Sequence, residues 1–147
     1  DTQGQHRHKG YVKALQEAGM PYDPDMVVWF YTEDRKIHPY EGIQNIAKNK
    51  ELDAVVCYND QNAMGVIRAL EALDLKIPDD VSVTGYDNFY MANQSDFRLT
   101  SIAHPQEKLG EMAAELLLDL VVNGENSEKQ KIMIEPELVE GTSCKRR

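Results

Sequence analysis

The sequence of 147 residues lacks any long hydrophobic run, and it contains only two cysteines. No apolar stretch approaches the roughly 20 residues that span a bilayer, which excludes a transmembrane segment. The first ten residues include His6, Arg7, His8 and Lys9 with no apolar stretch after them, so no signal peptide is recognisable. The isolated cysteines form neither a disulfide framework nor a paired metal site. This usage favours a reducing, cytoplasmic compartment and no membrane partner.

An excess of basic residues is also missing. The chain has 16 Lys and Arg against 25 Asp and Glu, which gives a formal net charge of −9 and a pI near 4.9. An acidic chain offers no electrostatic match to a phosphate backbone, so we expect no direct contact with nucleic acid. Because the sequence starts at Asp1 rather than at Met, we expect a piece of a longer protein.

Catalytic signatures are scarce as well. The sequence contains none of the glycine-rich or serine-centred motifs that are typical of nucleotide-binding and hydrolytic enzymes. His6 and His8 would point about 200° apart on a helix, so we expect no metal there. Asp53, Asp60 and Asp87 resemble the carboxylate cluster of a phosphoacceptor domain, although each equally suits a helix cap or a turn. We therefore predict a protein that is not an enzyme and that uses no cofactor.

What the sequence does contain is an alternation of helical and strand-like segments. Apolar residues recur at helical spacing over residues 5–18, 40–48, 60–73 and 106–122. Short β-branched or aromatic runs predict strands at residues 26–31, 54–58, 81–86, 99–103, 131–134 and 138–140. Such alternation implies crossover connections and an α/β fold with a parallel sheet. Ligands of these sheets gather at the carboxyl ends of the strands, here after residue 31, at 59–60 and at 86–88.

Three strings carry a family resemblance, namely VVCYND at 55–60, PDDVSVTGYDN at 78–88 and LTSI at 99–102. Their order and spacing, together with the helix pattern that follows Pro105, resemble the effector-binding core of the LacI/GalR family of bacterial transcriptional repressors. The resemblance covers essentially the whole chain. Its final third is most similar to the arabinose-responsive members, whose DNA-binding head is of the GntR type.

The resemblance implies a three-layer sandwich of the periplasmic-binding-protein-like type I, represented mainly by the C-terminal lobe. Residues 1–102 and 138–147 would form that lobe, and residues 103–137 would be a piece of the N-terminal lobe. The chain, 1–147, would then be a partial sugar-effector-binding domain, and the DNA-binding domain would be absent from it. The long helix would lack its native partners, so we expect this chain to dimerise or to swap that helix.

The resemblance also assigns the residues that would hold the effector. Arg7, Asn59 and Asp87 match polar contacts to sugar hydroxyls. His104 falls where relatives often carry glutamine, and Tyr31 would pack on the apolar face of a sugar. Plainer interpretations stay open, because Arg7 also suits an exposed helix position, Asn59 a helix cap and Asp87 a turn.

The resemblance further implies a homodimer with Met64, Phe89, Tyr90 and Phe97 at the subunit interface, although these residues equally suit an ordinary core. The implied function is that of a sugar-sensing domain of a repressor. L-arabinose or another monosaccharide would bind between the lobes and release the protein from operator DNA, which only the missing domain would contact. The alternative is a periplasmic-type sugar-binding protein of a transport system, since such proteins share the Asn-Asp element and the Gly-aromatic-Asp turn.

Overall fold

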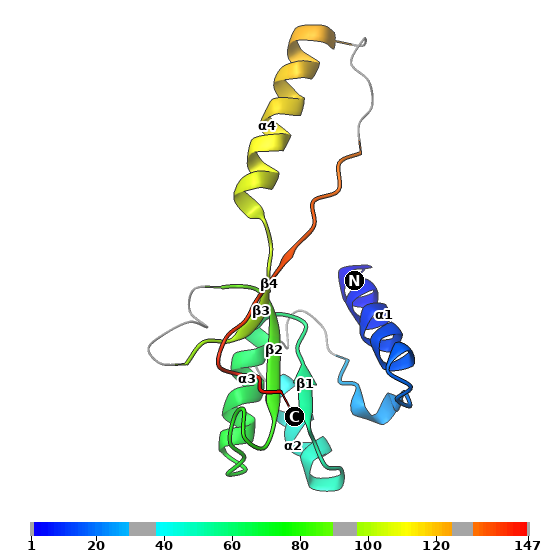
Figure 1. Ribbon diagram of the computed structural model, residues 1–147, viewed down its shortest axis with the longest axis vertical. Helices are drawn as coiled ribbons and strands as arrows, with labels where there is room; N and C mark the ends of the chain where they lie inside the picture. The colour runs from blue at the N-terminus through cyan, green and yellow to red at the C-terminus, as the bar shows by residue number, and fades with distance from the viewer. Residues whose placement is uncertain (1, 30–37, 90–96, 125–130, 147) are drawn as a thin grey trace.

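Helices and strands alternate along the chain, as the computed structural model shows for residues 2–29, 38–89, 97–124 and 131–146 (Figure 1). The elements are α1 (Thr2–Glu17), a 3-10 turn η1 (Pro24–Met26), α2 (His38–Asn49), β1 (Ala54–Val56), α3 (Asp60–Glu71), β2 (Ser82–Asp87), β3 (Thr100–Ala103), α4 (Gln106–Asn123) and β4 (Glu137–Val139). All the helices predicted from the apolar periodicity are confirmed, with ends that differ by a few residues.

The described strands form one sheet in the order β1-β2-β3-β4. β1 pairs with β2 and β2 with β3 in parallel, whereas β4 runs antiparallel to β3 with Ile102 opposite Leu138. The predicted α/β class is thus confirmed, and β4 is the exception to the parallel direction. Since β1, β2 and β3 are parallel, their carboxyl ends meet at one edge of the sheet, which we call the carboxyl edge.

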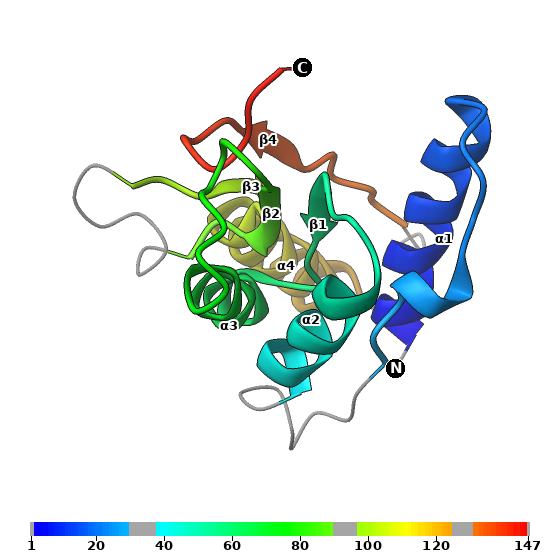
Figure 2. The same cartoon turned by 90° about the horizontal axis from the view of Figure 1, so that it is seen from below.

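Helices α2 and α3 lie side by side over one face of the sheet, and α1 lies beyond β1 (Figure 2). The core lies between these two helices and the sheet. Its buried side chains are Ile43, Ala63, Val66, Ile67, Ala69, Leu70, Val81, Val83 and Leu99. The α3 members recur at helical spacing, which is why this helix turns one apolar stripe toward the sheet.

The strand predicted at residues 26–31 is wrong for its described part. Met26 ends the turn η1, which begins because the Asp23 carboxylate accepts the N–H of Asp25 at 2.9 Å. Residues 27–29 are irregular, and the Trp29 side chain is 61% exposed. Val28 packs against α2 instead of a strand, since a Cβ atom on Gly42 would lie only 2.7 Å from Val28 Cγ1. Residues 30 and 31 lie outside the described residues.

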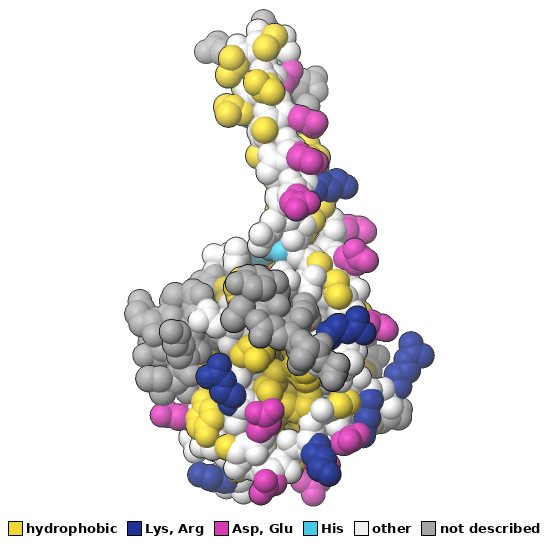
Figure 3. Space-filling view, turned by 90° about the vertical axis from the view of Figure 1, so that its left-hand side faces the viewer, with side chains coloured by type: hydrophobic (Ala, Val, Ile, Leu, Met, Phe, Trp, Pro, Cys, Tyr) yellow, Lys and Arg dark blue, Asp and Glu magenta, His cyan; other side chains and the backbone are white. Residues whose placement is uncertain are grey.

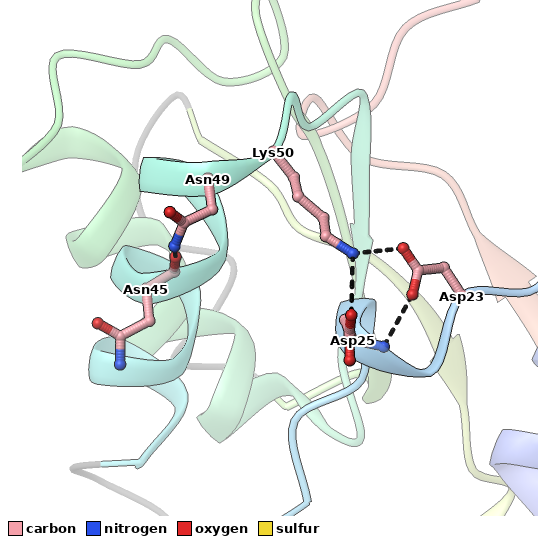
Figure 4. Close-up of polar contacts among 5 residues, drawn as sticks. All are labelled: Asp23, Asp25, Asn45, Asn49 and Lys50. Carbon is pink, nitrogen blue, oxygen red and sulfur yellow. Dashed lines mark hydrogen bonds and ion pairs between the residues drawn. The ribbon is translucent and has the colours of Figure 1, made fainter.

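An ion pair ties the turn η1 to α2. Lys50, directly after α2, contacts the carboxylates of both Asp23 and Asp25, the latter at 3.6 Å (Figure 4). In the last turn of the helix, Asn49 Nδ2 donates to the Asn45 carbonyl at 2.9 Å. The hydrogen bond from Lys50 lowers the pKa of Asp23 below 3.8. This contact fixes the segment that leads from α1 into the rest of the fold.

The segment 141–144 is fixed to the sheet by hydrogen bonds. The buried Ser143 Oγ donates to the Val83 carbonyl at 2.6 Å and accepts the N–H of Thr100 at 2.8 Å. The Ser143 carbonyl in turn accepts the N–H of Val83 at 2.9 Å. The backbone at Gly141 passes so close to that of Arg98 that a Cβ atom on residue 141 would lie 2.2 Å from the Arg98 carbonyl oxygen. The end of the chain is therefore an integral part of this sheet.

Helix α4 projects away from the sheet (Figure 1), and none of its side chains is buried. Hydrophobic side chains line one side of it and acidic side chains another (Figure 3). The sequence analysis expected this helix to lack its native partners, and Leu109 is 41% and Leu117 62% exposed because the helix extends beyond the sheet. No helix among the described residues is long and apolar enough to cross a membrane.

The strand predicted at residues 131–134 is also wrong. This segment has no regular structure, and the side chains of Ile132 and Met133 are exposed. Among the described residues no strand pairs with it, so its backbone groups have no ladder to join. The chain forms a strand only from Glu137, where β3 accepts it as a neighbour.

Candidate functional site

Arg7 of α1 lies between two tyrosine rings at the carboxyl edge. Its Cζ atom is 4.4 Å from the centre of the Tyr58 ring and 3.7 Å from that of Tyr86. Arg7 Nη1 also donates a hydrogen bond of 2.6 Å to the Tyr58 carbonyl. Tyr58 follows β1 and Tyr86 belongs to β2, so neighbouring parallel strands deliver both rings. Stacking on aromatic faces holds the plane of the half-buried guanidinium in one orientation.

His104 extends this arrangement on the other side of Tyr86. The two rings meet edge to face, with centres 6.4 Å apart and planes at 88°. His104 directly follows β3 and precedes α4, and its buried Nδ1 atom has no hydrogen-bond partner in the described part of the chain. Arg7, Tyr86 and His104 thus form a continuous row across the carboxyl edge, contributed by a helix and two strand ends.

Asn59 is the N-cap of α3. Its Oδ1 atom accepts the N–H of Asn62 at 3.0 Å, and the residue is only 8% exposed. The interpretation of Asn59 as a helix cap is therefore confirmed. A cap of this type typically stabilises a helix by about 1 kcal/mol. Its capping oxygen is occupied by the helix, while its place between Tyr58 and α3 puts the residue at the same edge as Tyr58.

Asp87 begins a turn with an unusual backbone. The half-buried Asp87 has φ of 101° and Asn88 has φ of 50°, so two successive non-glycine residues adopt the left-handed region. The N–H of Asn88 donates to Ser101 Oγ at 3.1 Å, and that of Phe89 donates to Asp60 Oδ2 at 2.5 Å. Side chains of α3 and β3 therefore hold the backbone of this turn from beneath.

Asp60 is the buried centre of that support. It is 1% exposed, and its Oδ1 atom accepts the Ser101 hydroxyl at 2.6 Å. Burial raises the pKa of Asp60 above 3.8, against hydrogen bonds from Ser101, Phe89 and Tyr86 that lower it. The carboxylate fits because residue 85 is glycine, since a Cβ atom there would lie 2.1 Å from Asp60 Oδ1. Burial also raises the pKa of the neighbouring Cys57 thiol to about 12.

The carboxylates compared with a phosphoacceptor cluster do not gather. Asp60 and Asp87 lie at the carboxyl edge, but Asp53 precedes β1 at the opposite end, where its carbonyl accepts the N–H of Ser82 at 3.0 Å. The phosphoacceptor interpretation is therefore wrong. His8 packs edge to face on Trp29, with ring centres 4.9 Å apart. No group of three or more His, Cys, Asp or Glu residues within the described ranges could hold a metal ion.

The other predicted residues differ in exposure from one another, and two of them are not described. Of the four residues expected at a subunit interface, Met64 and Phe97 are half-buried and pack against the core, whereas Phe89 is 50% exposed. Tyr90 and the predicted effector contact Tyr31 lie outside the described residues. The sequence analysis missed the two rings that enclose Arg7. Their signal was present, because Tyr58 and Tyr86 stand at the ends of predicted strands next to Asn59 and Asp87.

Comparisons with known proteins agree with this fold. Residues 1–144 match the family model described as periplasmic binding protein-like domain. Over 145 residues the chain is 32% identical to the arabinose metabolism transcriptional repressor of Halalkalibacterium halodurans, covering 95% of this chain and 39% of that protein. Over 141 residues it is 39% identical to the HTH-type transcriptional repressor PurR of Photorhabdus laumondii, covering 95% and 40%. The chain thus spans about 40% of the length of these curated relatives.

A solved structure shows the same relationship in three dimensions. The LacI family transcriptional regulator from Enterococcus faecium with bound ribose superposes with a TM-score of 0.77 at 29% sequence identity. The match covers 96% of this chain and 51% of that one.

Proposed function

The chain belongs to the family of periplasmic binding protein-like domains and is an effector-binding domain of the LacI/GalR repressor type. We propose that it senses a sugar for a transcriptional repressor. The proposed effector is L-arabinose or another monosaccharide. Two comparisons support a monosaccharide, since one relative is an arabinose metabolism repressor and one similar regulator holds ribose. Relatives that are repressors also favour this function over that of a sugar-transport component.

The observation that carries the proposal is the orientation of Arg7 between Tyr58 and Tyr86. A guanidinium offers several N–H donors in one plane, which suits adjacent hydroxyl groups of a sugar. Asp87, next to Tyr86, can accept hydrogen bonds from the same hydroxyls. We include Asn59, His104 and Tyr31 in the proposed site. His104 brings to this edge a buried nitrogen that has no hydrogen-bond partner among the described residues.

The proposed organisation divides the chain between two lobes. Residues 1–102 and 138–147 would form one lobe, and residues 103–137 would belong to the other. Two observations support this division, namely the hydrogen bonds that fix Ser143 to the sheet and the absence of buried side chains in α4. The DNA-binding domain would lie in the part of the relatives' length that this chain does not cover.

In the proposed mechanism the sugar binds between the lobes and shifts a cytoplasmic homodimer away from the geometry that grips operator DNA. Such an effector acts only through its different affinity for the two states. Met64, Phe89, Tyr90 and Phe97 are the proposed dimer contacts, and the 50% exposure of Phe89 is compatible with that role. The proposal includes no catalysis and no cofactor.

Calorimetric titration of the longer protein that contains this chain tests the proposal, with L-arabinose, ribose and galactose as ligands. We expect one sugar to bind with a dissociation constant on the order of micromolar, and we expect Arg7→Ala to abolish that binding. Arg68→Ala is the matched control, because Arg68 is an exposed arginine on α3 away from the row. Equal binding by Arg7→Ala and Arg68→Ala would contradict the assignment of Arg7.

A second measurement separates the repressor from the transport protein. Operator DNA selected from random sequences should bind the longer protein, and the sugar should weaken that complex. Sugar binding without any DNA binding would favour the transport alternative. Failure of all three sugars to bind would remove the sugar assignment and leave the family unchanged.

A further inference from the structure

We propose that Asp60 is a positioning residue, which acts through Ser101 and the backbone of residues 86–89 to hold Asp87 in the orientation that binds the effector. The inference deepens the proposed function and rests on it, because it takes Asp87 as an effector contact. Asp60 does not touch the effector in this proposal. It is 1% exposed and lies beneath the turn, where a sugar at the carboxyl edge cannot reach it.

The turn needs support because its backbone is intrinsically unfavourable. Residues other than glycine crowd their own Cβ atoms at positive φ, and here Asp87 at 101° and Asn88 at 50° do so in succession. Released from its contacts, the segment would relax toward ordinary φ values. The Asp87 carboxylate would then leave the position that it holds beside Tyr86.

The support consists of one connected set of hydrogen bonds. Asp60 accepts the Ser101 hydroxyl through Oδ1 and the Phe89 N–H through Oδ2, at 2.6 and 2.5 Å. Ser101 in turn accepts the Asn88 N–H at 3.1 Å. The two residues after Asp87 are thus bound to a single buried pair, one member from α3 and one from β3. A carboxylate suits the role because it only accepts hydrogen bonds, and the Ser101 hydroxyl and the N–H groups of Phe89 and Tyr86 all donate to it.

The chain offers a matched control for this pair. Ser101 and Ser143 are both buried, and each hydroxyl donates one bond of 2.6 Å and accepts one backbone N–H. The Ser143 hydroxyl is hydrogen-bonded to Val83 and Thr100 within the sheet, whereas the Ser101 hydroxyl is hydrogen-bonded to Asp60 and Asn88. Replacing either serine by alanine removes one donated and one accepted hydrogen bond, but only Ser101→Ala frees the turn.

The test compares sugar affinity in the longer protein for Ser101→Ala, Ser143→Ala, Asp60→Ala and Asp60→Asn, each measured on folded protein. We expect Ser101→Ala and Asp60→Ala to bind the sugar about tenfold more weakly than the wild type, and Ser143→Ala to bind it normally. Asp60→Asn should restore most of the affinity, since an amide oxygen still accepts the Phe89 N–H and its NH₂ group can donate to Ser101 Oγ. Equal affinity of Ser101→Ala and Ser143→Ala would overturn the inference, because both would then be merely structural.

Hydrogen exchange separates this inference from the proposed function. Without any ligand, the Asn88 and Phe89 amides should exchange about tenfold faster in Ser101→Ala than in Ser143→Ala when global stability is matched with denaturant. If the wild type binds no sugar, the proposed function fails, and the exchange rates still decide whether the pair holds the turn. Equal rates in the two serine variants would show that it does not.

Discussion

Substitution of Gly85 by alanine is the sharpest single test of the packing beneath the candidate site. The added Cβ atom would lie 2.1 Å from Asp60 Oδ1 and 2.7 Å from Leu99 Cδ2. Both neighbours are buried, at 1% exposure each, so neither can swing into solvent. The Asp60 carboxylate would have to move by about 1 Å to restore an ordinary contact, which would lengthen its bond of 2.6 Å from Ser101 by up to about 1 Å.

The cost follows from these displacements. Forcing an extra methyl group into a packed interior costs about 1–3 kcal/mol, and leaving buried polar partners unsatisfied costs about 1–3 kcal/mol more. We therefore expect Gly85→Ala to lower the free energy of unfolding by about 2–5 kcal/mol. Since domains are typically stable by only about 5–15 kcal/mol, the loss is a large fraction of the total.

Urea unfolding followed by circular dichroism measures this effect on the chain. Gly10→Ala is the matched control, because a Cβ atom on Gly10 meets nothing within 4 Å and the residue lies inside α1. Alanine there should stabilise the helix by up to about 1 kcal/mol, so the same substitution has opposite signs at the two positions. A Gly85→Ala variant within about 0.5 kcal/mol of the wild type would refute the packing described for Asp60.

Three further predictions concern other parts of the chain. The contact with Lys50 lowers the pKa of Asp23 and so stabilises the fold above pH 3.8, and this stabilisation is lost as the pH falls through the folded-state pKa. By NMR, the Asp23 carboxyl should therefore titrate below 3.8, and its pKa should return toward 3.8 in Lys50→Met. An unchanged titration midpoint in that variant would argue against the ion pair. Because the Cys57 pKa is raised to about 12, iodoacetamide should modify this half-buried thiol more slowly in the folded chain than in urea, and equal rates at Cys57 in both would contradict the raised pKa. The exposed stripe of α4 should make this chain associate with increasing concentration in light scattering, and Leu117→Glu with Val121→Glu should reduce that association; a monomer at every concentration would disprove it.

The helices of this fold can be predicted because local spacing alone specifies them. The positions Ala63, Val66, Ile67 and Leu70 repeat at the period of a helix, and all of them are buried. The apolar run at residues 26–31 is different. Such a run indicates only that a partner must bury it, and for Val28 that partner is α2 rather than a neighbouring strand.

In the candidate site, too, some residues can be placed from the sequence and some contacts cannot. Asn59 and Asp87 could be placed at the carboxyl edge from the sequence, since each follows a strand of a predicted parallel sheet. The contact of these strand-end rings with Arg7 could not be predicted, because Tyr58 lies 51 positions from Arg7 and the contact depends on where α1 docks. Nor does any local pattern reveal that Asp60 and Ser101, 41 positions apart, share a hydrogen bond beneath the turn.

The strands that connect to the two ends of α4 determine how the sheet would carry a pulling force on this helix. The chain runs through β3 into α4 and comes back through β4, which lies antiparallel beside β3 (Figure 1). A force that draws α4 away from the sheet therefore pulls β3 and β4 in the same direction, and the ladder between them carries no shear. The load falls instead on the bonds between Ser143 and Val83 and on the parallel ladder from β2 to β3, whose last pair joins Asp87 to Ala103. Tension on α4 is thus delivered to the strand end that carries Asp87.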